Sequence, residues 1–86
     1  MRVTVVRSGG FAGIERHGEA DTASDPVLRA LVARVDLSRV PPPGRIPDQF
    51  VYEVGIDGAV ATVGESRLTG PLRELVHHVL GHGAAR

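Results

Sequence analysis

The chain lacks cysteine, lysine and asparagine entirely. Without cysteine it can form no disulfide, carry no thiolate nucleophile and hold no cysteine-ligated zinc ion. All ten cationic side chains are therefore arginine, and we attribute the missing lysine and asparagine to the codon bias of a GC-rich genome. No apolar run approaches the roughly 20 residues that a membrane span requires, so we expect no membrane partner.

Net charge is absent as well. The ten arginines are balanced by ten acidic residues, and the formal net charge is zero. This balance argues against a nucleic-acid partner recruited by bulk charge. With 86 residues, 42% of them apolar, the chain predicts one small domain over residues 1–86, with a frayed tail at 83–86. Residues 1–3 open a strand pattern and not a signal peptide, so we expect a cytoplasmic protein.

The first half of the chain predicts two strands and a helix. Residues 2–7 are rich in β-branched side chains and predict a strand that stops at Ser8-Gly9-Gly10. Residues 11–17 resume an extended pattern, so the two segments are expected to form a hairpin. Asp25 is the expected N-cap of a helix that begins at Pro26. The apolar stripe of this helix comprises Leu28, Leu31, Val32 and Val35.

The second half predicts a hairpin and another helix. Residues 49–56 alternate between apolar and polar side chains, and Asp57-Gly58 is a favoured type I′ turn pair. This register pairs Ile56 with Ala59, and it places on one face Tyr52, Val54, Ile56, Ala59, Ala61 and Val63. A helical stripe follows Thr69-Gly70-Pro71, and Gly81 is expected to end that helix before His82.

These elements predict a fold of the α+β class. Their order is β-β-α-β-β-α, which indicates a four-stranded, mostly antiparallel sheet with both helices on one face. The pattern leaves the order of the strands within the sheet open.

No catalytic constellation emerges, so we expect a protein that is not an enzyme and needs no cofactor. His78 and His82 have the four-residue spacing of a two-histidine metal pair, and His77 lies beside them. No third ligand is evident, and solvated histidines near a helix C-terminus are more ordinary than a metal site. We therefore expect no metal at this cluster.

A proline-rich loop is expected at residues 37–47, because the prolines end the first helix near Asp36 and favour an extended, polyproline-like chain. Such a loop is stiff and therefore preorganised for recognition. Alternatively, its apolar residues tuck into the core while the loop covers the sheet edge. The candidate partner-binding residues in this loop are Leu37, Ser38, Arg39, Val40, Pro41, Pro42 and Pro43.

Residues 3–14 read Val-Thr-Val-Val-Arg-Ser-Gly-Gly-Phe-Ala-Gly-Ile, and with this signature the chain resembles the emfourin family. The resemblance continues through the proline-rich loop, the strand at 50–54 with its Asp57-Gly58 turn, and the helix that begins at Pro71. The distinctive part is a bend made of Arg7, Ser8, Gly9, Gly10 and Phe11.

Emfourins are small protein inhibitors of protealysin, a thermolysin-like zinc metalloprotease. The resemblance thus implies an inhibitor that blocks the cleft of such a protease, and a free protein that is a monomer or a weak dimer. The alternative is a non-catalytic interaction module or homodimer without inhibitory activity. The bend and the proline-rich loop compete as the contact surface, and the residues alone do not decide between them.

Overall fold

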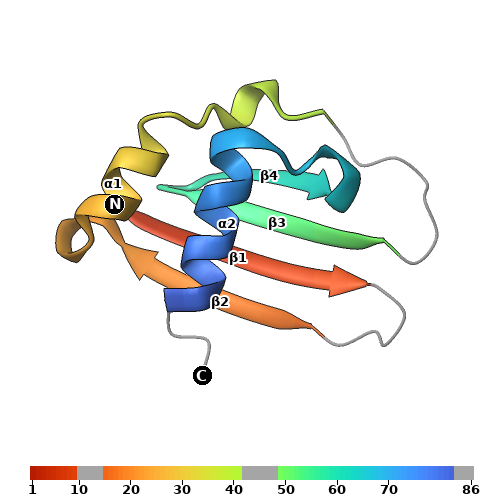
Figure 1. The fold of residues 1–86 in the computed structure, drawn as a ribbon, viewed down its shortest axis with the longest axis horizontal. Coiled ribbons are helices and arrows are strands. Elements are labelled where there is room, and N and C mark those ends of the chain that lie inside the picture. The colour runs from red at the N-terminus through yellow and green to blue at the C-terminus, as the bar shows by residue number, and fades with distance from the viewer. Residues whose placement is uncertain (10–14, 42–48, 83–86) are drawn as a thin grey trace.

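The computed structural model describes residues 1–9, 15–41 and 49–82. Within these ranges, four strands and two helices follow in the predicted order (Figure 1): β1 (Arg2–Gly9), β2 (Arg16–Asp21), α1 (Pro26–Val32), β3 (Phe50–Ile56), β4 (Ala59–Gly64) and α2 (Gly70–His82). Three short 3₁₀ turns connect them: η1 (Thr22–Ser24), η2 (Leu37–Arg39) and η3 (Glu65–Arg67). None of the helices in these ranges is long and apolar enough to cross a membrane.

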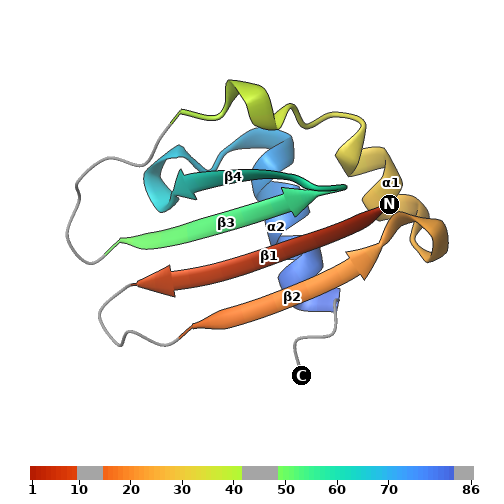
Figure 2. The same ribbon diagram turned by 180° about the vertical axis from the view of Figure 1, so that it is seen from behind.

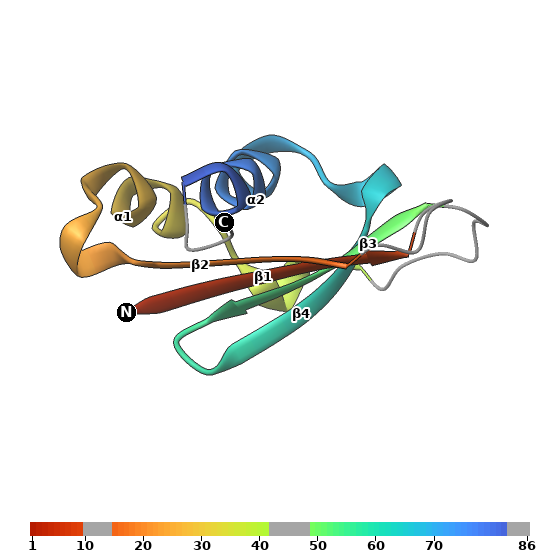
Figure 3. The same cartoon turned by 90° about the horizontal axis from the view of Figure 1, so that it is seen from below.

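The strands form one sheet in the order β2-β1-β3-β4, and every neighbouring pair is antiparallel. Figure 3 shows α1 and α2 on the same side of this sheet, and Figure 2 shows the opposite face without a covering helix. The predicted α+β class and element order are confirmed. The strand order, which the pattern left open, places β1 and β3 in the centre.

The β3–β4 hairpin has the predicted register. Ile56 lies opposite Ala59, Val54 opposite Ala61 and Tyr52 opposite Val63. Both turn residues have positive φ, 50° at Asp57 and 90° at Gly58, as a type I′ turn requires. Tyr52, Val54 and Val63 on one face of the hairpin are buried, whereas Glu53, Val60 and Thr62 on the other are exposed. A register shift of one residue would exchange the two faces.

The core lies between the sheet and the two helices. Its buried apolar side chains are Val3, Val5, Leu28, Leu31, Tyr52, Val54, Val63, Leu68, Leu75, Val76, Val79 and Leu80. The helix α2 passes close to the backbone of β2 at Gly18. A Cβ at Gly18 would lie 2.8 Å from the carbonyl oxygen of Val79, so only glycine fits there without a shift of the helix. Val79 and Leu80 on α2 are buried where they meet Gly18, and this burial of apolar surface holds α2 against the sheet.

Asp25 and Pro26 begin α1 as predicted. The Asp25 side chain accepts a hydrogen bond from the backbone N–H of Leu28 at 3.0 Å, and Pro26 occupies the first turn. The predicted end near Asp36 is wrong, because α1 ends at Val32. The chain then tightens through hydrogen bonds between residues three apart, from Arg34 N to Leu31 O and from Val35 N to Val32 O.

Two other boundaries differ from the prediction. The second strand begins at Arg16 and runs to Asp21, beyond the predicted end at His17, because β1 offers pairing partners as far as Arg2. The earlier part of that predicted strand, residues 11–14, lies outside the described residues. The helix α2 continues through Gly81 to His82. Burial of Val79 and Leu80 against the sheet outweighs the helix-breaking tendency of Gly81.

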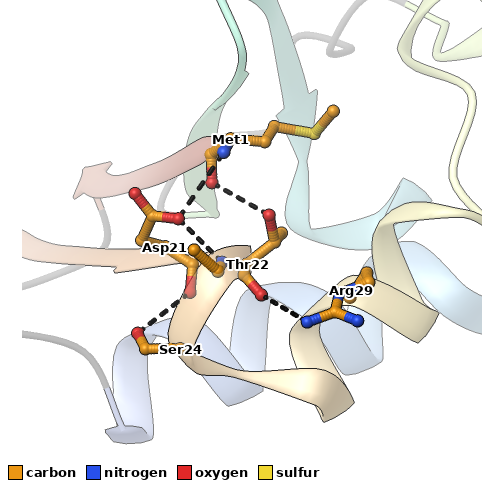
Figure 4. A network of polar contacts seen from close by, with 6 residues as sticks. Met1, Asp21, Thr22, Ser24 and Arg29 are labelled. Atoms are coloured by element: carbon orange, nitrogen blue, oxygen red, sulfur yellow. Dashed lines mark hydrogen bonds and ion pairs between the residues drawn. The ribbon is translucent and has the colours of Figure 1, made fainter.

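A polar network joins the first residue to the segment between β2 and α1 (Figure 4). The Met1 carbonyl oxygen accepts hydrogen bonds from the backbone N–H of Thr22 at 2.9 Å and from its hydroxyl at 3.3 Å. The Met1 ammonium lies 3.5 Å from Asp21, and Arg29 donates to the Thr22 carbonyl oxygen at 3.3 Å. Thr22 thus connects the start of β1 to α1, which positions the helix over the sheet.

Candidate partner-binding site

The signature bend leaves the sheet beside the point where the chain enters β3. Gly9, the last residue of β1, lies opposite Phe50, the first residue of β3. Its φ is +84°, and a Cβ there would lie 3.0 Å from the Gln49 carbonyl oxygen. Glycine is therefore required at this position both by its backbone conformation and by the close approach of the neighbouring chain. The signature bend and the segment preceding β3 thus start from one end of the sheet.

Within the described part of the signature bend, Arg7 and Ser8 are half-buried and Gly9 is exposed. The Arg7 guanidinium carbon lies 4.3 Å from the centroid of the Phe50 ring, a distance typical of a cation–π contact. This contact ties β1 to β3 just before the bend. Gly10 and Phe11, the remaining residues of the predicted bend, lie outside the described residues.

The candidate loop divides into packed and exposed residues. Leu37 and Val40 are half-buried and pack against the core. Ser38, Arg39 and Pro41 are exposed. Over Leu37–Arg39 the predicted extended chain is wrong, because these residues form the turn η2. Pro42 and Pro43 lie outside the described residues, and the binding role of the whole segment stays a prediction.

Asp36 holds η2 in place. Its carboxylate accepts hydrogen bonds from the Ser38 hydroxyl at 2.6 Å and from the Ser38 backbone N–H at 3.0 Å. These two bonds, the hydroxyl first, lower the pKa of the Asp36 carboxyl from its ordinary value of 3.8. A groove of about 290 Å³ lies beside this turn, lined by Val32, Val35, Asp36, Leu37, Ser38, Ile56 and Ala59. The turn therefore lies against the end of the β3–β4 hairpin.

The start of β3 is anchored by η3, a connection that the sequence pattern did not reveal. The Glu65 carboxylate accepts a hydrogen bond from the Phe50 backbone N–H at 3.2 Å. The Gln49 side-chain oxygen accepts bonds from the Ser66 hydroxyl at 3.4 Å and from its backbone N–H at 3.5 Å. Polar residues separated by so many positions leave no periodic signal, so only the fold brings them together.

The neighbouring histidines His77 and His78 near the end of α2 have different surroundings. His78 Nε2 lies 2.7 Å from Asp25 Oδ2, whereas His77 is exposed. Hydrogen bonds from the Leu28 backbone N–H and then from His78 lower the pKa of the Asp25 carboxyl. Among the described residues, no group of three or more histidine, aspartate and glutamate side chains is arranged to hold a metal ion.

Comparison with known proteins gives one family match. The model of the family named Emfourin matches residues 5–80, a range that includes both the signature bend and the candidate loop. No curated protein and no solved structure matches the chain. Because the matched range is most of the 86 residues, the chain belongs to the emfourin family.

Proposed function

We propose that this protein inhibits a thermolysin-like zinc metalloprotease of the protealysin type by blocking its active-site cleft. Membership of the emfourin family over residues 5–80 carries this proposal, because that family consists of metalloprotease inhibitors. The protein would act without catalysis and without a cofactor. A cysteine-free chain is compatible with a reducing compartment, and we place the inhibitor in the bacterial cytoplasm.

The arrangement at one end of the sheet supports the proposal. Gly9 lies opposite Phe50 in the central strand pair, so the signature bend and the segment before β3 adjoin the two central strands of the sheet. Inhibitors gain affinity when their contact segments are preorganised, because less conformational entropy is lost on binding. A contact surface carried by β1 and β3 meets this requirement.

Within the candidate loop, the exposed residues are the better contacts. Leu37 and Val40 pack against the core, and we assign them a supporting role. Ser38, Arg39 and Pro41 are exposed and are the members that a protease surface can reach. Proline also lacks the backbone N–H that a protease commonly binds in an extended substrate, which favours a segment that resists cleavage.

Inhibition is tested by mixing the purified protein with a protealysin-type enzyme and following cleavage of a small peptide substrate. We expect cleavage to fall as the protein approaches equimolar amounts, with an interface of standard size, about 1,600 Å² in total. Unaltered cleavage at micromolar protein would remove the proposal.

Two sets of variants locate the contact surface. Phe11→Ala tests the signature bend, and Arg39→Ala combined with Pro41→Ala tests the candidate loop. Val60→Ser is the matched control, because Val60 is 63% exposed on the uncovered face of the sheet. A rise in the inhibition constant for only one set identifies the segment that enters the cleft, and the control should leave the constant unchanged.

The uncovered sheet face favours a second candidate, a homodimer without inhibitory activity. Val60 is exposed there, and Val6 and Val51 are half-buried on the same face. Apolar side chains on an open sheet face are a common dimer contact. Light scattering decides: a tight dimer whose formation is abolished by Val60→Asp would support this candidate, and a monomer at micromolar concentration would exclude it.

A further inference from the structure

Two arginines face each other on neighbouring strands next to the signature bend. Arg7 on β1 lies directly opposite Arg16 on β2, so both side chains leave the same face of the sheet. Arg16 Nη2 donates a hydrogen bond to the Leu80 carbonyl oxygen at 3.2 Å, which places this side chain on the face that carries α2. The contact of Arg7 with Phe50 lies on that face too, because Phe50 packs against the core.

Like charges opposite each other in a sheet are unfavourable unless something compensates them. The ion pairs between described residues use Arg2, Arg34 and Arg39, and none uses Arg7 or Arg16. Glu15, the acidic residue next to Arg16 in sequence, instead contacts His17 at 2.7 Å. Within the same ranges, Arg7 Nε is buried without a hydrogen-bond partner. Apart from the bond of Arg16 Nη2 to Leu80, neither guanidinium group is paired with a described residue, so its outer N–H groups keep hydrogen-bonding capacity for an anion.

The position of this pair suits a partner contact. Figure 1 shows β1 and β2 continuing past α2 toward the end from which the signature bend leaves. Arg7 is only two residues before Gly9, so its side chain lies at the base of the bend. Phe50 holds the Arg7 guanidinium in one orientation, and Leu80 holds that of Arg16. Both donors are thus oriented before any partner arrives, which lowers the entropy lost on binding.

We propose that Arg7 and Arg16 form a carboxylate-binding site that receives an acidic side chain of the protease partner. This inference rests on the proposed inhibitory function and names the chemistry of one contact in it. A planar guanidinium offers paired N–H donors that match the two oxygens of a carboxylate. Because the net charge of the chain is zero, the attraction is local and not a property of the whole surface.

The test measures the inhibition constant and the association rate at low and high salt for four variants. Arg16→Gln removes one cation from an exposed position, and Arg7→Gln removes the other. Arg16→Lys keeps the charge without the planar donor pair. Arg2→Gln is the matched control on β1, because Arg2 pairs with Glu19 at 3.0 Å on the opposite face of the sheet. Thermal unfolding of each variant reports whether the fold is retained.

We expect Arg16→Gln and Arg7→Gln each to raise the inhibition constant about tenfold and to weaken its salt dependence. Arg16→Lys should recover part of the loss, and Arg2→Gln should stay within about twofold of the unmodified protein. Arg7→Gln also removes the contact with Phe50, so its effect on inhibition combines two losses. Arg16→Gln is therefore the decisive variant, provided that its midpoint of thermal unfolding matches that of the unmodified protein.

The outcomes separate the two proposals. If the unmodified protein inhibits and Arg16→Gln and Arg7→Gln both remain within about twofold of it, the inhibitory function stands and the carboxylate site is wrong. If Arg2→Gln weakens inhibition as much as they do, the effect is one of general charge and the site is again wrong. If the unmodified protein does not inhibit, the proposed function fails and the site fails with it.

Discussion

His78 Nε2 lies 2.7 Å from Asp25 Oδ2 and joins the two helices of the fold. The other oxygen of the same carboxylate, Oδ1, accepts the Leu28 backbone N–H that begins α1. Both side chains are largely shielded from solvent, with 15% of His78 and 24% of Asp25 exposed. One carboxylate therefore caps α1 and also binds a side chain of α2. His78 thus has a structural role, because it holds α2 beside α1.

Removing this contact should destabilise the fold. We expect His78→Ala to lower the midpoint of thermal unfolding by about 5 °C, because the capping carboxylate loses a largely buried partner. His77→Ala is the matched control, since His77 is the exposed neighbour on the same helix. Calorimetry of the two variants makes the comparison, and equal midpoints would contradict the structural role of His78.

Stability should fall in acid. The pKa values of Asp21, Asp25 and Asp36 lie below their ordinary value of 3.8, chiefly because each carboxylate accepts a backbone or hydroxyl hydrogen bond in the folded state, from Ala23, Leu28 and Ser38 respectively. The unfolded chain then binds protons at a higher pH than the folded one. The stabilising contribution is full above the ordinary value and is lost as the pH falls through the lowered values.

Urea unfolding at pH 7, 4 and 3 measures this loss. We expect the free energy of unfolding to decline between the last two conditions, about where the unfolded carboxyls take up protons. Replacing the three aspartates together by asparagine should flatten the decline. An unchanged pH dependence in that variant would show that other groups are responsible.

Replacing glycine by alanine should have opposite effects on stability at Gly18, which contacts α2 closely, and at Gly81, which has open space around it. Gly18→Ala should cost about 1–3 kcal/mol, because its methyl group would press on the Val79 carbonyl oxygen. Gly81→Ala should stabilise by about 0.5–1 kcal/mol, because it lies within α2 and a Cβ there meets nothing within 4 Å. Chemical denaturation of both variants checks the signs, and a stabilising Gly18→Ala would contradict the packing.

Leu37 and Arg39 should separate stability from binding in the candidate loop. Leu37→Ala is expected to cost roughly 1–2 kcal/mol of stability, less than a fully buried leucine, because Leu37 packs against the core from a half-buried position. Arg39→Ala should leave stability nearly unchanged, since its side chain is 87% exposed. If Leu37→Ala leaves stability intact and raises the inhibition constant, Leu37 is a contact and not a support.

The candidate site was only partly predictable. The bend in the sequence predicts a glycine at residue 9. The Gln49 carbonyl oxygen also excludes a side chain there, but it lies close to Gly9 only because β1 pairs with β3. Likewise, the extended pattern predicted over residues 11–17 includes Arg16, yet its position opposite Arg7 depends on the hairpin register. Periodicity reports local geometry, whereas these contacts join positions whose separation in sequence carries no pattern.

The amino-acid sequence by itself determined the element order, the cap at Asp25 and the register around Asp57-Gly58. These depend on short-range backbone preferences and on the alternation of apolar side chains. Only the tertiary structure decided that β1 lies between β2 and β3, that α1 stops at Val32 and that α2 continues past Gly81. The physical reason is that strand pairing and burial between distant segments outweigh local propensity wherever the two disagree.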